Sequence, residues 1–261
     1  MKKEKYEETL NSQTQNIIKH FSARAEKYDK SHDWVNDGNL LDILETNLPI
    51  ESKKILDLGA GTGMVAKHIL KKRGDKCELV AIDICQEMLD KIDEIHIKTV
   101  CSGVEDLPFE NDTFDAVVSR QCLHYVGDVE KTINEVKRVL KSNGTFILAQ
   151  IVPYNKDTSS DWRSVVQIRQ PLRKWYFTSD EWNSIIEKHN FHMEFQQKYV
   201  RTASVGKWSK KYCRSNDVIN QYKQELLSKN DHFKKIYEVY ETNDDVIFCS
   251  YWHIAKYIKL E

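Results

Sequence analysis

Three glycines at alternate positions follow a short apolar run in the segment ILDLGAGTG, residues 55–63. Gly59, Gly61 and Gly63 lack a Cβ atom, so the backbone can adopt positive φ and a ligand can lie against it. The next residues, MVAKHILKK, predict a helix whose first N–H groups are free to bind a carboxylate or phosphate. A strand, a glycine turn and a helix in this order indicate a site for a nucleoside cofactor.

The spacing of the glycines separates two classes of cofactor. The dinucleotide fingerprint G-x-G-x-x-G requires a third glycine where this chain has Met64, which disfavours NAD. The pattern D-L-G-x-G-x-G, which starts at Asp57, resembles motif I of the class I S-adenosylmethionine-dependent methyltransferases. The resemblance is to the ubiquinone- and menaquinone-type and type 11 small-molecule enzymes, and it extends over about residues 21–152.

Two later residues fit the same resemblance. A strand predicted at residues 78–84 ends in Asp83, which is placed to accept hydrogen bonds from both ribose hydroxyls in a Rossmann-like unit. Met88 follows on the next helix, where its polarizable thioether is suited to pack on adenine. The resemblance therefore implies that S-adenosylmethionine is the cofactor.

One position departs from the family pattern. Many relatives carry an aspartate that accepts from the adenine amino group where this chain has Gly103, within a segment that resembles acidic-x-x-Leu-Pro-Phe. Glu105 or a backbone carbonyl could take over that contact. Alternatively, Glu105 and Asp106 belong to a solvated loop.

The loop SRQCLHY, residues 119–125, follows the fourth predicted strand, at the sheet edge where open α/β proteins bind ligands. His124 is the candidate general base, because histidine is the side-chain type whose ordinary pKa lies closest to neutrality. The alternative is that His124 is a structural or cofactor-packing residue. Arg120 and Gln121 either contact the cofactor or acceptor or hydrogen-bond to local backbone. Cys122 is expected to be a small packing residue.

The N-terminal segment HFSARAEKYDKSHDW, residues 20–34, resembles the segment that closes over the cofactor in the ubiquinone-type enzymes. Tyr28 is a candidate donor to the methionine carboxylate, and Trp34 either caps the acceptor pocket or is buried. The family resemblance implies cofactor contacts from this segment, the glycine turn, the second strand and the two later loops. These are Tyr28, Asp57, Gly59, Ala60, Gly61, Gly63, Asp83, Ile84, Met88, Val104, Glu105, Ser119 and Arg120.

A helix predicted over residues 161–175 contains three arginines and two tryptophans. Arg169 and Arg173 are spaced to share one helix face, where guanidinium groups would suit a carboxylate or phosphate on the acceptor. The alternative is a solvated face paired with nearby acids. Trp175 fits either a flat acceptor or a hydrophobic core.

Composition is that of an ordinary globular enzyme. The 261 residues are 40% hydrophobic and 30% charged, and the net charge of −1 gives no field that would attract nucleic acid or an anionic membrane. The six cysteines show no C-x-x-C spacing, which is typical of reduced thiols. The N-terminal segment MKKEKYEETLNSQTQ is polar and lacks the apolar run of a signal peptide. We therefore expect a cytoplasmic protein. No set of ligands around His189 and His192 predicts a metal site.

The sequence predicts one α/β domain with a Rossmann-like, seven-stranded, mostly parallel sheet. Residues 1–53 form a helical cap, residues 54–152 form the cofactor-binding core, and residues 153–261 complete the sheet around a long helical insertion at 208–240. Within the core, a helix over residues 129–144 is expected to stop at Asn143 and Gly144.

Three functions remain open at this stage. The motif order favours methyl transfer to a small-molecule acceptor, whose specificity would come from the two helical flanks. A protein acceptor is a second possibility, whereas the Asn/Asp-Pro-Pro-aromatic and Pro-Cys motifs of nucleic-acid methyltransferases are missing. The third is a non-catalytic module that binds S-adenosylmethionine.

Overall fold

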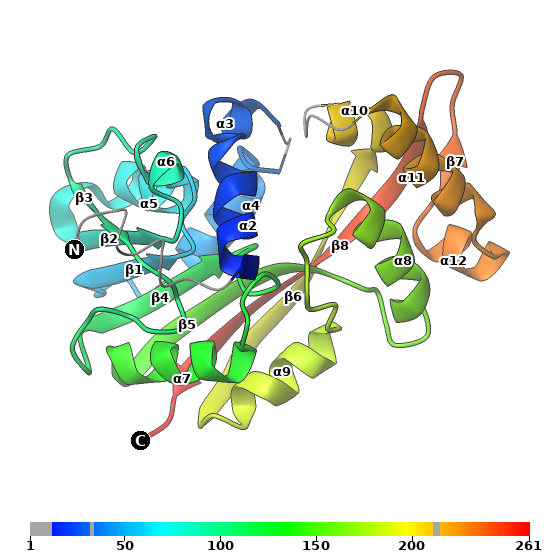
Figure 1. Cartoon of the computed structure of the whole chain (residues 1–261). Coiled ribbons are helices and arrows are strands. Elements are labelled where there is room, and N and C mark those ends of the chain that lie inside the picture. Colours follow the sequence, from blue (N-terminus) through cyan, green and yellow to red (C-terminus); the bar gives the residue numbers. More distant parts are fainter. Residues whose placement is uncertain (1–11, 32–33, 211–214) are drawn as a thin grey trace.

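The computed structural model describes residues 12–31, 34–210 and 215–261. One continuous sheet forms the centre of the molecule, with helices on both of its faces (Figure 1). Its strands are β1 Lys54–Leu58, β2 Glu78–Asp83, β3 Ile97–Cys101, β4 Phe114–Arg120, β5 Leu140–Val152, β6 Phe191–Ser204, β7 Tyr240–Glu241 and β8 Val246–Lys259.

The strand order is β3-β2-β1-β4-β5-β8-β6, and the short β7 pairs with β8. Strands β1 to β5 run parallel to one another. Strand β8 is antiparallel to both β5 and β6. The order reverses between β1 and β4, and open α/β sheets bind ligands at the carboxyl ends of the strands on either side of such a switch. The predicted α/β sheet is confirmed, with the two-residue β7 as an eighth strand.

Helices cover the sheet because its strands are apolar on both faces. In β1, Ile55 packs with one core cluster and Leu56 and Leu58 with the other. The first cluster includes side chains from α4 Gly38–Thr46, α5 Met64–Arg73, α8 Ser159–Arg169 and α11 Asn216–Ser228. The second includes side chains from α7 Val129–Val139 and α9 Ser179–Glu187, which lie below the sheet in Figure 1.

Both flanks of the core are helical, as the sequence predicts. The N-terminal flank holds α2 Ser12–Ser22, the 3₁₀ turn Ala25–Lys27, α3 Tyr28–Ser31 and α4; the insertion between β6 and β8 holds α10 Val205–Lys210, α11 and α12 Asp231–Ile236. The remaining short elements are the 3₁₀ turn Gly74–Lys76 and α6 Gln86–Leu89. Helices α8, α10, α11 and α12 gather at one end of the molecule, away from β1 to β3 (Figure 1).

Two predicted helix ends are wrong. Helix α7 ends at Val139, and Asn143 and Gly144 lie within β5 because Leu140 already pairs with Phe114 of β4, ahead of a bulge. Asn143 does take the positive φ expected of it, at 59°. Helix α8 ends at Arg169 because Pro171 disfavours helical backbone at Gln170.

Arg169 and Arg173 therefore do not share a helix face, since Arg173 lies in the segment after α8. The alternative of a solvated face is wrong as well, because Arg169 is 3% exposed and Arg173 is 4% exposed.

Candidate functional site

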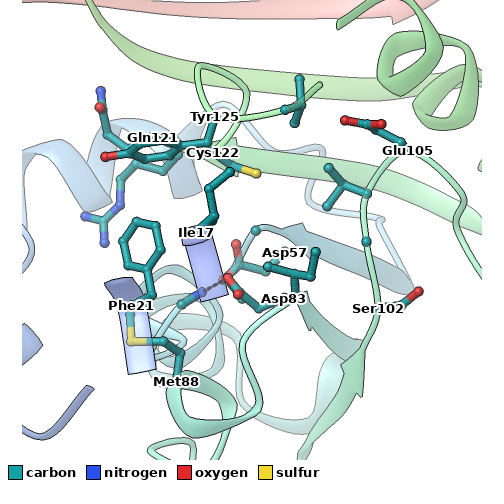
Figure 2. Close-up of a pocket in the computed structure, with 18 of the residues that line it drawn as sticks. Ile17, Phe21, Asp57, Asp83, Met88, Ser102, Glu105, Gln121, Cys122 and Tyr125 are labelled. Carbon is teal, nitrogen blue, oxygen red and sulfur yellow. Dashed lines mark hydrogen bonds between the residues drawn. The ribbon is translucent and has the colours of Figure 1, made fainter. Parts of the chain in front are cut away.

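A cavity of 530 Å³ opens at the carboxyl ends of β1, β2 and β4. Its volume lies in the range of pockets that enclose a small organic ligand. The walls come from the glycine turn, α6, the loops after β3 and β4, and the N-terminal flank (Figure 2). Most of the cofactor residues implied by the family resemblance line it: Tyr28, Asp57, Gly59, Ala60, Gly61, Asp83, Ile84, Met88, Val104, Glu105 and Arg120.

The glycine turn has the backbone that its sequence requires. Gly59, Gly61 and Gly63 have φ values of 71°, 56° and 74°, which side chains rarely tolerate. At Gly59 a Cβ atom would also lie 2.2 Å from the Sγ atom of Cys122. The N–H groups of Gly59 and Ala60 both donate to the carbonyl of Ile82 at 2.9 Å, so the turn folds back onto β2.

Asp83 holds the turn from the side of β2. Its carboxylate accepts from the N–H of Gly61 at 2.8 Å through one oxygen and from the N–H of Cys85 at 2.9 Å through the other. Burial raises the pKa of Asp83, and these backbone hydrogen bonds oppose the rise. Each oxygen keeps a lone pair, so the carboxylate can still accept from two hydroxyl groups.

Asp57 stands beside it at the end of β1 (Figure 2). Its carboxylate is buried and accepts from the N–H of Ala66, in the first turn of α5, at 3.1 Å. Burial raises the pKa of Asp57 to about 7, against the opposing effects of that hydrogen bond and of the Arg120 guanidinium. A cationic ligand group in the cavity would favour the ionised form.

Arg120 connects the loop after β4 to the N-terminal flank. Its Nη1 atom donates to the carbonyl oxygens of Trp34 at 3.3 Å and Val35 at 3.1 Å, and its guanidinium lies 5.2 Å from the Trp34 ring centroid. Burial lowers the pKa of Arg120. Trp34 is itself buried, yet it lines the cavity together with Gln121. Gln121 has a positive φ of 58°, an uncommon conformation for a non-glycine residue.

The adenine side of the predicted site has an unexpected arrangement. The Glu105 carboxylate lines the cavity, but one of its oxygens accepts from the N–H groups of Gly127 and Asp128. It therefore fixes the loop before α7, and Asp106 is exposed beside it. Ser102 and Gly103 also line the cavity, so the hydroxyl of Ser102 is available where Gly103 offers no side chain.

Sequence reasoning missed several walls of the cavity. Thr14, Ile17 and Phe21 of α2 reach it, and the Phe21 ring meets that of Tyr125 edge-on at 5.4 Å. The spacing of Ile17 and Phe21, four residues apart, was the available signal, since such residues share a helix face. Thr62 and Lys131 were also missed.

His124 does not line the cavity, and neither do five other residues that the sequence predicts for the site. The imidazole is 1% exposed, and its Nδ1 atom lies 2.8 Å from Oε1 of Gln150, so Nδ1 carries the proton. Burial and the Arg173 charge hold the pKa of His124 well below its usual value. We therefore do not retain His124 as the base.

The other five have local roles. Ser119 donates to the carbonyl of Leu58 at 3.0 Å, joining β4 to β1. Trp175 donates from Nε1 to Val126 at 2.9 Å and stacks on Phe177. Gly63 is the N-cap residue before α5, and Arg169 and Arg173 are buried at the end of α8 and in the segment after it.

Comparison with known proteins agrees with this geometry. Residues 56–148 match the family described as a methyltransferase domain. The ubiquinone/menaquinone biosynthesis C-methyltransferase UbiE of Rickettsia prowazekii is 31% identical over 141 residues, which are 49% of this chain and 57% of that protein. Residues 56–148 thus form a methyltransferase domain of the class I S-adenosylmethionine-dependent kind. S-adenosylmethionine is the methyl donor of this family.

Other relatives of this methyltransferase chain have different names. Mouse arginine-hydroxylase NDUFAF5 is 34% identical over 125 residues, which are 47% of this chain and 35% of that protein. The chain thus matches about a third of this relative's length. Two solved structures share the fold. BH2331 of Bacillus halodurans C-125 superposes with a TM-score of 0.78 at 19% identity, over 86% of this chain and 100% of that chain. YcgJ of Bacillus subtilis superposes with a TM-score of 0.75 at 22% identity, over 88% of this chain and 100% of that chain.

Among the residues that the structure describes, no group of three His, Cys, Asp or Glu side chains could hold a metal ion. No described helix is both long enough and apolar enough to span a bilayer. Cys77, Cys85, Cys101, Cys122 and Cys249 form no disulfide with one another, and Cys213 lies outside the described residues.

The close approach at Gly59 predicts a large effect of a single methyl group. Gly59→Ala should lower the free energy of unfolding by on the order of 1–3 kcal/mol, because the new Cβ is strained at positive φ and collides with Cys122. Gly38→Ala is the matched control, since nothing lies within 4 Å of its Cβ position. Urea unfolding measures both, and equal stability of the two variants would contradict the assigned turn geometry.

The raised pKa of Asp57 predicts a dependence of stability on pH. The folded protein holds this proton with a pKa of about 7, against an ordinary value of 3.8, so the contribution of Asp57 to stability falls as pH rises from about 4 to 7. Asp57→Asn removes that dependence. Between pH 5 and pH 8, the wild type should lose about 2.6 kcal/mol of unfolding free energy more than the variant. Parallel curves for the two proteins would refute the assignment.

Proposed function

We propose that the chain transfers a methyl group from S-adenosylmethionine to a small-molecule acceptor by in-line displacement, leaving S-adenosylhomocysteine. The observation that carries the proposal is the shared cavity, in which the glycine turn, Asp83 and Asp57 face one enclosed volume. That volume and its mixture of carboxylates, backbone N–H groups and apolar side chains fit a nucleoside linked to a charged amino acid.

Each part of the cofactor has candidate contacts. Asp83 would accept from the ribose hydroxyls with its remaining lone pairs. Met88 and Val104, both buried, would pack on adenine, with Ile84 beside them and Ser102 at its polar edge. Asp57 suits the ammonium group of the methionine part of the cofactor. Burial raises the pKa of Asp57, and a nearby positive charge would stabilise its ionised form.

The methionine carboxylate would lie between the glycine turn and the N-terminal flank. Arg120 and Tyr28 line this part of the cavity from two different segments. The hydroxyl of Thr62 donates to Asp29 at 2.5 Å, which ties that flank to the turn. Closure of the flank would therefore exclude water from the reacting atoms, which strengthens every electrostatic contact inside.

The bound sulfonium supplies an electrophilic methyl group. What remains for the protein is to hold the acceptor atom about 3 Å from that methyl, in line with the bond that breaks. Gln121 and Tyr125 form a wall of the cavity across from Asp57 and Asp83 and are the candidate acceptor contacts, with Trp34 beside Arg120 (Figure 2). With His124 buried away from the cavity, this chemistry relies on alignment rather than on a histidine base.

A protein acceptor is the second candidate function, because a relative that shares this domain is named an arginine-hydroxylase. The enclosed cavity favours a small acceptor, since its N-terminal wall of Thr14, Ile17 and Phe21 covers the cofactor region. Incubation with S-adenosylmethionine labelled on its methyl group, followed by separate counting of small-molecule and protein fractions, distinguishes the two acceptors. A third result, tight cofactor binding with no label transferred to either fraction, would favour a binding module.

Calorimetric titration tests the cofactor assignment directly. S-adenosylmethionine and S-adenosylhomocysteine should bind, whereas NAD should not. Asp83→Ala should weaken binding by roughly 1–3 kcal/mol, because it removes charge-assisted hydrogen bonds to ribose. Asp90→Ala is the control, since this exposed carboxylate accepts from the Gln86 amide nitrogen and does not line the cavity. Unchanged affinity in folded Asp83→Ala would remove Asp83 from the site.

A further inference from the structure

The two oxygens of the Glu105 carboxylate have different surroundings. Oε1 accepts from the backbone N–H groups of Gly127 and Asp128, the second at 3.2 Å. Oε2 accepts from no donor among the residues that the structure describes, although the side chain lines the cavity. Figure 2 shows Glu105 on the same side of the cavity as Ser102, with its carboxylate pointing inward. One oxygen is therefore held by the protein, and the other is available to a ligand.

The backbone around Glu105 fixes the position of its carboxylate. A Cβ atom at Gly127 would lie 3.0 Å from Oε1 and 3.4 Å from Oε2, so this loop leaves room for the carboxylate only because it has no side chain there. The loop is anchored in turn, since the Asp128 side chain accepts from the N–H of Lys131, in the first turn of α7, at 2.9 Å. A group held in this way does not have to be ordered when a ligand binds.

The segment that carries Glu105 begins beside the residue proposed for the ribose. The N–H of Ser102 donates to the backbone carbonyl of Asp83 at 3.0 Å. Val104 of this segment and Met88 of α6 are buried apolar side chains that line the cavity, and both are proposed to pack on adenine. A purine packed on them would have its polar edge near Ser102 and Glu105.

The two polar side chains near that edge differ in what they can select. The Ser102 hydroxyl both donates and accepts, so it suits an amino group and a carbonyl oxygen alike. A carboxylate only accepts, so it suits an amino group and repels a carbonyl oxygen. Selection between two purines that differ in this group therefore requires Glu105 rather than Ser102.

We propose that Oε2 of Glu105 accepts from the exocyclic amino group of adenine and makes the site selective for a 6-amino purine over a 6-oxo purine. This inference rests on the proposed function, because it assigns one edge of the proposed cofactor. Asp106 is the other acid of this segment that lines the cavity. It is exposed, so water competes for its carboxylate, and its contribution to selectivity is small.

The test compares two ligands of the full-length chain. S-adenosylhomocysteine and its deaminated analogue S-inosylhomocysteine, in which a carbonyl oxygen replaces the amino group, are titrated calorimetrically under the same conditions. The wild type should bind S-adenosylhomocysteine at least about tenfold more tightly, as expected for one hydrogen bond to a charged group. The ratio of the two affinities is the measured quantity, because a general loss of cavity shape affects both ligands alike.

Three variants assign the selectivity to one carboxylate. Glu105→Gln keeps an oxygen for the N–H groups of Gly127 and Asp128 and puts an amide donor in place of Oε2, so the ratio should fall by about tenfold or more. Asp106→Asn makes the same change of charge at the next residue and should leave the ratio within about twofold. Gly127→Ala keeps the carboxylate but displaces it, so the ratio should fall here as well.

Each failure has a distinct meaning. Folded wild-type protein that binds neither ligand would contradict the proposed function, and this inference with it. Equal binding of both ligands by the wild type would overturn this inference alone. An unchanged ratio in Glu105→Gln, or a ratio that falls in Asp106→Asn instead, would also overturn it. If Glu105→Gln binds neither ligand, Gly127→Ala decides, and a wild-type ratio in that variant counts against Glu105.

Discussion

The carboxylate of Asp83 is the contact on which the cavity depends. It accepts from Gly61 in the turn after β1 and from Cys85 before α6, so two loops from different strands share one anchor. Hydrogen bonds to a charged group contribute about 1.5–3 kcal/mol each, enough to fix a loop that has no core of its own. Those bonds also orient the remaining lone pairs, which we propose accept from the ribose hydroxyls. In that proposal one side chain both fixes the loops and contacts the cofactor.

This arrangement explains why the turn needs glycine. A turn that bends back to bond with Ile82 and Asp83 must take positive φ at Gly59, Gly61 and Gly63. The loop after β4 then packs against Gly59 through Cys122, with no room for a Cβ. The cavity is thus bounded by close backbone contact on one side and by the N-terminal helical flank on the other.

The two halves of the chain contribute differently to the proposed reaction. The parallel half, from β1 to β5, supplies the carboxylates and N–H groups suited to the cofactor. The N-terminal flank supplies apolar rings, those of Phe21, Tyr28 and Trp34, to the same cavity. Arg120 donates hydrogen bonds to the carbonyl oxygens of Trp34 and Val35. A movement of the N-terminal flank would therefore change the position of Arg120 at the end of β4.

The sequence predicted the sheet and most of the side chains that line the cavity, because both depend on local pattern. Apolar strands and a glycine turn can be recognised from a few neighbouring residues. Asp83 could be placed because it ends the predicted strand at residues 78–84. Asn143 was misread because pairing of Leu140 with β4 outweighed a good helix stop, and the end of α8 was missed because Pro171 acts on the residue before it. Burial of Arg169 and Arg173 could not be predicted, because it depends on how α8 packs against the sheet and α11.

A crystal structure of the protein with S-adenosylhomocysteine tests the central claim most directly. The account predicts that both ribose hydroxyls donate to Asp83, that adenine packs against Met88 and Val104, and that the sulfur faces Gln121 and Tyr125. A ligand bound outside this cavity, or one whose ribose makes no contact with Asp83, would contradict it.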